Sequence, residues 1–102
     1  MPVTAMPKRY VFLCFACNGF GASSRKDSIT CSPRCRVRLH RDPEAREQLE
    51  FVRDEIGVPP GYYARSMAAR ALAPELMENC RDVDAITDKV FEIACRMAKE
   101  TQ

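Results

Sequence analysis

Two pairs of cysteines constrain this chain more than any other feature. Cys14 and Cys17 form the first pair, Cys31 and Cys35 form the second, and 13 residues separate the pairs. Zinc takes four thiolates in a tetrahedron, and two short pairs that flank a hairpin-sized loop can supply them without any other scaffold. The spacing therefore predicts one Zn²⁺ ion bound by these four side chains.

The residues around each pair indicate how the thiols would converge. An apolar strand runs through the first pair into a turn at Asn18-Gly19, which places the first two thiols at the end of the strand. Before the last cysteine, Ser32 is a suitable N-cap and Pro33 a suitable first helical residue. Cys35 would then lie in the first helical turn, where the helix dipole favours a thiolate.

A knuckle, a short hairpin and a helix that carries the last ligands follow one another in a treble-clef zinc finger. The segment from Cys31 to Arg41 reads C-S-P-R-C-R-V-R-L-H-R. It resembles the second half of small bacterial and phage treble-clef fingers, C-S-x-x-C-R-x-R followed by further basic residues. The resemblance covers roughly residues 8–41. It implies a small zinc-stabilised α+β fold, and it implies little about function because those fingers are mostly uncharacterised.

Alternatives stay open for the cysteines. A disulfide pair would suit a secreted protein, but residues 1–7 lack the basic start and apolar run of a secretory signal, so we expect reduced thiols and a cytoplasmic location. His40 follows on the same predicted helix and could replace Cys35 as the fourth ligand. Cys80 and Cys95 lie in a helical region, and we expect both to be free and partly buried.

Charge divides the chain into two predicted regions. Residues 1–41 hold eight Lys or Arg and one acid, whereas residues 42–102 hold eight Lys or Arg and thirteen acids. This asymmetry indicates that the zinc finger predicted for residues 1–41 meets a negatively charged partner. We expect residues 42–102 to be helical. No stretch of the sequence is long and apolar enough to predict a membrane span, so we expect no membrane partner.

Helix start and stop signals subdivide the second region. Asp42, Pro43 and Glu44 provide an N-cap, a first helical proline and an acid in the first turn, and Gly57 is a stop. The predicted helices span residues 43–56, 62–72, 75–80 and 83–99. The apolar faces expected on the first and last of them comprise Ala45, Leu49, Val52 and Ile56, and Val83, Ile86, Val90, Ile93, Ala94 and Met97. Such faces must pack on one another or on a second copy, so a homodimer stays open.

The helix predicted after Ser32 carries a dense basic surface. Cys35 and Leu39 would face the metal and the core, which leaves the arginines on the outer faces. Arginine pairs in bidentate fashion with phosphates and with guanine edges, and this half of the chain has few acids. We therefore expect nucleic-acid binding, to DNA rather than RNA. The residues expected to contact it are Arg34, Arg36, Arg38, Arg41, Lys8, Arg9, Arg25 and Lys26.

Other functions stay open beside nucleic-acid binding. The basic face could be merely solvated, or the chain could be an adaptor or inhibitor of phage or plasmid origin that docks on an acidic patch of a host protein. Tyr62 and Tyr63, beside a Pro-Pro-Gly break, could form a recognition surface, although packing between helices is the favoured interpretation. We expect no catalysis, because the chain has a single histidine, no phosphate-binding glycine loop and thiolates that would close the zinc shell.

Overall fold

The computed structural model describes residues 10–79 and 82–100. Strand β1 (Tyr10–Leu13) pairs with β2 (Phe20–Ser23) as an antiparallel hairpin. The helices that follow are α1 (Pro33–Arg41), α2 (Pro43–Phe51), η1 (Val52–Ile56), α3 (Pro60–Leu72), α4 (Pro74–Asn79), η2 (Val83–Ile86) and α5 (Thr87–Glu100). The prediction of a small α+β fold with one hairpin and mostly helical structure is confirmed at that level.

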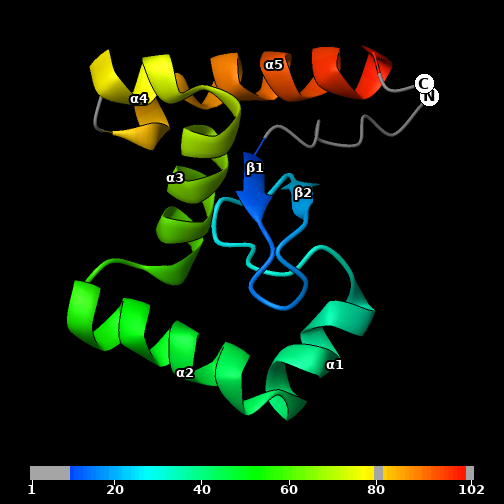
Figure 1. Cartoon of the computed structure of the whole chain (residues 1–102), viewed down its shortest axis with the longest axis vertical. Helices are drawn as coiled ribbons and strands as arrows, with labels where there is room; N and C mark the ends of the chain where they lie inside the picture. The colour runs from blue at the N-terminus through cyan, green and yellow to red at the C-terminus, as the bar shows by residue number, and fades with distance from the viewer. Residues whose placement is uncertain (1–9, 80–81, 101–102) are drawn as a thin grey trace, which may run out of the picture.

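The hairpin lies at the centre and the helices surround it. Figure 1 shows α5 along one end of the molecule, α1 and α2 along the other, and α3 running between these ends beside β1. Both α3 and α5 pack against β1, and α1 packs against α2. Among the described residues, no helix is long and apolar enough to cross a membrane.

Strand β1 is buried on both of its faces. Phe12 belongs to one hydrophobic cluster, with Leu39 of α1 and Val52 of η1 among its members, whereas Val11 belongs to a second cluster built mainly from α3, η2 and α5. Because side chains alternate along a strand, neighbouring residues point into different clusters. Both clusters combine residues from before and after position 41, so the packing shows no boundary between the predicted finger and the predicted helical region. That division stays a prediction.

The first two helices begin where the sequence predicts. The Ser32 hydroxyl accepts a hydrogen bond from the Cys35 amide at 3.2 Å, and the Asp42 carboxylate accepts one from the Glu44 amide at 3.0 Å. These N-caps satisfy backbone donors that each helix would otherwise leave unpaired. A proline occupies the first turn of α1 and of α2, as expected.

The predicted helix over residues 43–56 changes from α-helix to π-helix at Val52. The segment η1 is π-helical, and the Gly57 amide donates to the Val52 carbonyl at 3.0 Å. Gly57 ends it with φ at 80°, a conformation that glycine adopts without a steric penalty. The wider turn shifts the residues after Val52 around the helix, and Ile56 is 44% exposed. The expectation that Ile56 shares the buried face is wrong for this reason.

The last predicted helix, over residues 83–99, forms as two elements, η2 and α5. It begins as the 3-10 turn η2, where the Asp82 side chain accepts from the Asp84 amide. Val83, Ile86 and Val90 are buried as expected, but Met97 is 47% exposed. Cys95 is exposed as well, so its expected partial burial is wrong, and Cys80 lies outside the described residues.

Arg65 is a buried charge that joins three parts of the chain. This α3 side chain is 5% exposed, and its Nε donates to the Lys26 carbonyl at 3.0 Å. Its Nη1 forms an ion pair with Asp84 of η2. The guanidinium lies 5.7 Å from the ring centre of Tyr10 and 5.6 Å from that of Tyr62, which favours cation–π attraction. Hydrogen bonds, an ion pair and aromatic faces together satisfy a charge that burial alone would destabilise.

The start of α3 also touches the loop after β2 directly. A Cβ atom added at Gly61 would lie 2.7 Å from the Asp27 Cα and 2.9 Å from the Lys26 carbonyl oxygen. Real Cβ atoms do not approach backbone atoms so closely, so this helix can pack on the loop only because residue 61 is glycine. The loop is therefore held by close packing at Gly61 and by the Arg65 hydrogen bond, one helical turn apart.

We expect Arg65→Met to lower the free energy of unfolding by about 2–3 kcal/mol, because it removes a charge-assisted ion pair and leaves the Lys26 carbonyl without its donor. The matched control is Arg70→Met on the same helix, since Arg70 is exposed. Urea unfolding followed by circular dichroism measures both variants. Equal losses for the two substitutions would show that Arg65 has no special stabilising role.

Candidate metal centre

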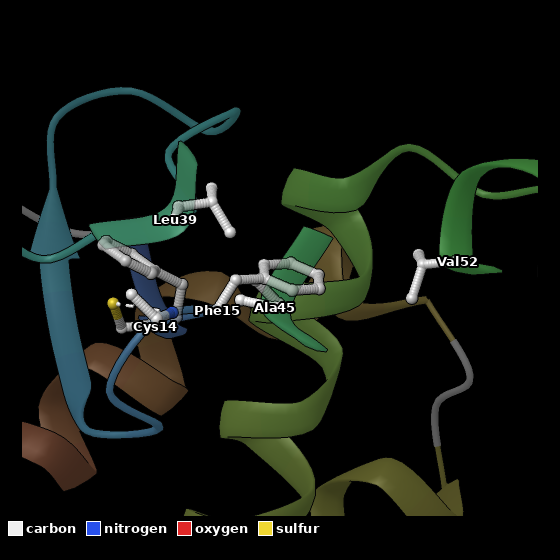
Figure 2. Packing of buried hydrophobic residues seen from close by; sticks show 8 residues of the cluster. Cys14, Phe15, Leu39, Ala45 and Val52 are labelled. Atoms are coloured by element: carbon white, nitrogen blue, oxygen red, sulfur yellow. Dashed lines mark hydrogen bonds between the residues drawn. The ribbon is translucent and has the colours of Figure 1, made fainter. Parts of the chain in front are cut away.

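The first cysteine pair lies in the turn that joins β1 to β2. The Cys14 amide donates to the Gly19 carbonyl and the Asn18 amide to the Cys14 carbonyl, both at 2.9 Å. Asn18 closes the turn with φ at 60°, in the left-handed region that asparagine tolerates better than most residues. These bonds curl the chain so that Cys14 and Cys17 face one side. Figure 2 shows Cys14 below Leu39 of α1, at the edge of the first hydrophobic cluster.

The second pair reaches the first through the loop before α1. The Phe15 amide donates to the Ile29 carbonyl at 2.9 Å, which fixes this loop against the hairpin turn. A Cβ atom at Gly21 would lie 3.0 Å from the Cys31 Cβ and 2.7 Å from the Phe12 ring. The glycine therefore lets Cys31 approach β2. Ser32 then starts α1, and the first helical turn presents Cys35.

The structure brings the predicted thiols together. Within the described residues, the sulfurs of Cys14, Cys17, Cys31 and Cys35 all lie within 4.8 Å of one another, close enough to bind a metal ion. The Cys31 sulfur is 3.6 Å from that of Cys17 and 3.6 Å from that of Cys35. All four cysteines are free. The cluster includes Cys35 and not His40, which is exposed on α1.

The thiols perturb one another's ionisation. Burial raises the pKa of Cys14, but hydrogen bonds from the backbone of Cys17, Cys31 and Ala16 outweigh it and lower the pKa to about 7. Desolvation of its sulfur, with hydrogen bonds to the neighbouring thiols and the Cys14 charge, raises the pKa of Cys31 to about 12. Adjacent thiolates repel, so the four sulfurs cannot all ionise at neutral pH unless a cation compensates their charge. A bound metal ion supplies that compensation.

Helix α1 carries a groove beside the cysteine cluster. Arg34, Val37, Arg38 and Arg41 line an open groove of about 680 Å³, together with Pro33 and Asp42 at its ends. Three of the predicted basic contacts therefore share one face, as their spacing predicts. Arg36 is exposed but does not line this groove. Sequence reasoning missed Val37, although its position three residues after Arg34 and four before Arg41 places it on the same helical face.

Arg25 and Lys26 do not line this groove. Arg25 and Lys26 are exposed, and their loop is anchored on α3 through Arg65 and Gly61 rather than on α1. Lys8 and Arg9 lie outside the described residues. Arg25 and Lys26 are therefore not among the residues that line the α1 groove.

Comparisons with known proteins do not assign a function to this site. No protein-family model, curated protein or solved structure matches the chain. The cysteine cluster and the arginine-lined groove therefore carry the functional argument.

We expect protein purified under reducing conditions to carry one metal ion per chain. Cys31→Ser should lose that ion, because serine removes the thiolate that contacts two neighbouring sulfurs. Cys95→Ser is the control, since Cys95 is exposed and outside the cluster. Elemental analysis of the purified variants measures the metal content. A metal content near zero in the unsubstituted protein would contradict the assignment.

Chelation should also destabilise the fold beyond the hairpin. Cys14 belongs to the same cluster as Ala45, Val52 and Ala64, so loss of the metal should disturb the packing of α2 and α3 as well. Thermal unfolding followed by circular dichroism should show a lower midpoint after chelation and recovery when the metal is restored. An unchanged midpoint would mean that the core forms without the metal.

Proposed function

We propose that this chain is a small zinc-finger protein that binds nucleic acid, DNA rather than RNA, through the arginine-lined groove of α1. The observation that carries the proposal is the groove itself, where Arg34, Arg38 and Arg41 share one outer face of a helix whose other face is fixed at the metal centre. The protein acts by binding and not by catalysis, because four thiolates complete a zinc shell and leave no position for an activated water.

The sulfur geometry supports zinc as the metal. A tetrahedral ion with Zn–S bonds of about 2.3 Å separates its sulfurs by about 3.8 Å. The Cys31 sulfur lies 3.6 Å from the sulfurs of Cys17 and Cys35, close to that value, and all four sulfurs lie within 4.8 Å of one another. Four thiolates also select zinc or iron over harder metals such as magnesium or calcium. The order of turn, loop and helix around these ligands is compatible with the treble-clef arrangement that the sequence resembles, and we propose that arrangement for residues 8–41.

The charges around α1 support an anionic ligand. The helix has no acid in its first turn, and its last turn is basic. Its neighbour carries more acids than bases, because the exposed charged side chains of α2 and η1 are two arginines, Arg46 and Arg53, and five acids, Glu44, Glu47, Glu50, Asp54 and Glu55. A phosphate backbone would be repelled along α2, so nucleic acid would be confined to the outer face of α1. Segregation of the charges in this way orients a polyanion on the surface.

We expect the affinity for a short DNA duplex to fall with salt at a slope of about −3, because each arginine that neutralises a phosphate releases counterion. Arg34→Gln/Arg38→Gln should reduce that slope by about two units. Arg36→Gln is the matched control, since it removes the same charge from another face of α1 and should leave the slope nearly unchanged. Fluorescence anisotropy at several salt concentrations measures the slopes, and elemental analysis verifies that each variant retains its metal.

Failure of the unsubstituted protein to bind duplex or single-stranded nucleic acid at low salt would rule out this function. If Arg36→Gln changed the salt slope as much as Arg34→Gln/Arg38→Gln does, nucleic acid would contact the whole surface of α1 and not only the groove. These two outcomes distinguish a wrong ligand from a wrong surface.

A second candidate function is that of a protein-binding adaptor. A separate groove of about 320 Å³ combines apolar and aromatic side chains, the chemistry typical of protein interfaces. Its lining comprises Ile56, Val58, Tyr62, Tyr63, Ser66, Met67, Arg70 and Met77. Both tyrosines are also held in packing contacts, since the Tyr62 hydroxyl donates to Asp82 and the Tyr63 ring lies 6.1 Å from that of Phe15. A partner retained in high salt and lost in Ile56→Glu would favour this function.

A further inference from the structure

Val37 is an apolar side chain that packs in neither hydrophobic cluster. It lies on the nine-residue helix α1 and is 49% exposed, whereas Leu39 on the same helix is buried in the first cluster. A β-branched residue loses rotamer freedom in a helix and adds nothing to helix stability. Val37 is therefore only half covered within the described structure and gains nothing from helix propensity, and the residues around it indicate what could cover the rest.

Three arginines lie around Val37 in the α1 groove, and Asp42 lies at one end of it. Arg34 lies three residues before Val37, and Arg38 and Arg41 follow it one and four residues later, all four lining one groove. From Arg34 to Arg41 the helix advances about 10 Å, at a rise of about 1.5 Å per residue. That length matches about three base-pair steps of duplex DNA at about 3.4 Å each. A helix of this size fits a major groove about 12 Å wide.

The chemistry of a single apolar group among arginines favours one feature of DNA. Phosphates attract the arginines but offer nothing to a methyl group. In the major groove, however, the C5-methyl of thymine is the apolar group that side chains contact. Double-stranded RNA lacks this methyl, and its deep, narrow major groove does not admit side chains.

We infer that α1 enters the major groove of duplex DNA and that Val37 packs against a thymine methyl group, while the flanking arginines bind phosphates or guanine edges. This inference rests on the proposed function and adds to it a groove, a type of nucleic acid and a residue that reads sequence. A protein partner fits this face less well, because one valine offers little apolar area for the apolar centre of a protein interface.

The test begins with the full-length, metal-loaded protein and a library of random-sequence DNA duplexes. Rounds of selection should enrich a site that contains thymine. The enriched duplex is then resynthesised with deoxyuridine in place of each thymine, one position at a time, which removes only the methyl group. At one position we expect binding to weaken about fourfold, the effect of no longer burying one methyl group. Fluorescence anisotropy measures each pair of duplexes.

Variants at one position assign the effect to Val37. Val37→Ser should bind the thymine and deoxyuridine duplexes equally, whereas Val37→Thr, which keeps one methyl and the same shape, should retain part of the difference. Ile56→Ser is the matched control, because Ile56 is an exposed aliphatic residue on η1, outside the α1 groove, and it should preserve the full difference. Metal content measured on each variant verifies that the helix is still anchored.

Several results would overturn the inference. Selection without enrichment, equal binding of thymine and deoxyuridine duplexes by the unsubstituted protein, persistence of the difference in Val37→Ser, or equally tight binding of an RNA duplex would each do so. If DNA still bound through the arginines in these cases, the proposed function would stand without the inference. If no nucleic acid bound at all, both would fail, and the α1 face would be assigned to a protein partner.

Discussion

The double burial of β1 is the constraint on which the rest of this structure depends. Val11 and Phe12 are neighbours in sequence, yet each is buried in a different hydrophobic cluster because strand side chains alternate. A single short strand therefore supports two small cores, one toward α1 and α2 and one toward α5 (Figure 1). Helix α3 contributes Ala64 to the first core and Ala68 to the second, so it joins them along its length. Neither core is formed by one half of the chain alone.

The cysteine cluster continues the first core beyond the end of β1. Cys14 follows the strand directly, is buried, and packs in the same cluster as Phe12. A metal ion at this place would link the hairpin turn to the start of α1, so that metal binding and core formation stabilise each other. In α1 itself, Leu39 is buried and Cys35 is partly buried. Because only these two side chains hold α1 against the rest of the molecule, its other faces carry polar and cationic side chains.

The two kinds of arginine in the molecule have different surroundings and different roles. Arg65 is buried, and the Lys26 carbonyl, Asp84 and two aromatic rings satisfy its charge, so it fixes the loop after β2 against α3 and η2. The arginines of the α1 groove, Arg34, Arg38 and Arg41, are exposed. Sequence position does not distinguish these cases. Burial does, because a buried guanidinium requires nearby partners and an exposed one does not.

The sequence by itself determined the features that depend on local rules. The cysteine spacing predicted the cluster, Ser32 and Asp42 predicted helix starts, and Gly57 predicted a helix end, because ligand spacing, N-caps and left-handed conformations involve only nearby residues. Only the tertiary structure decided which residues are covered. It exposed Ile56, Met97 and Cys95, buried Arg65, left Val37 uncovered among arginines and separated the Arg25 loop from α1. Helical periodicity identifies an apolar face, but the extent of the surface that packs against it depends on segments far away in the chain.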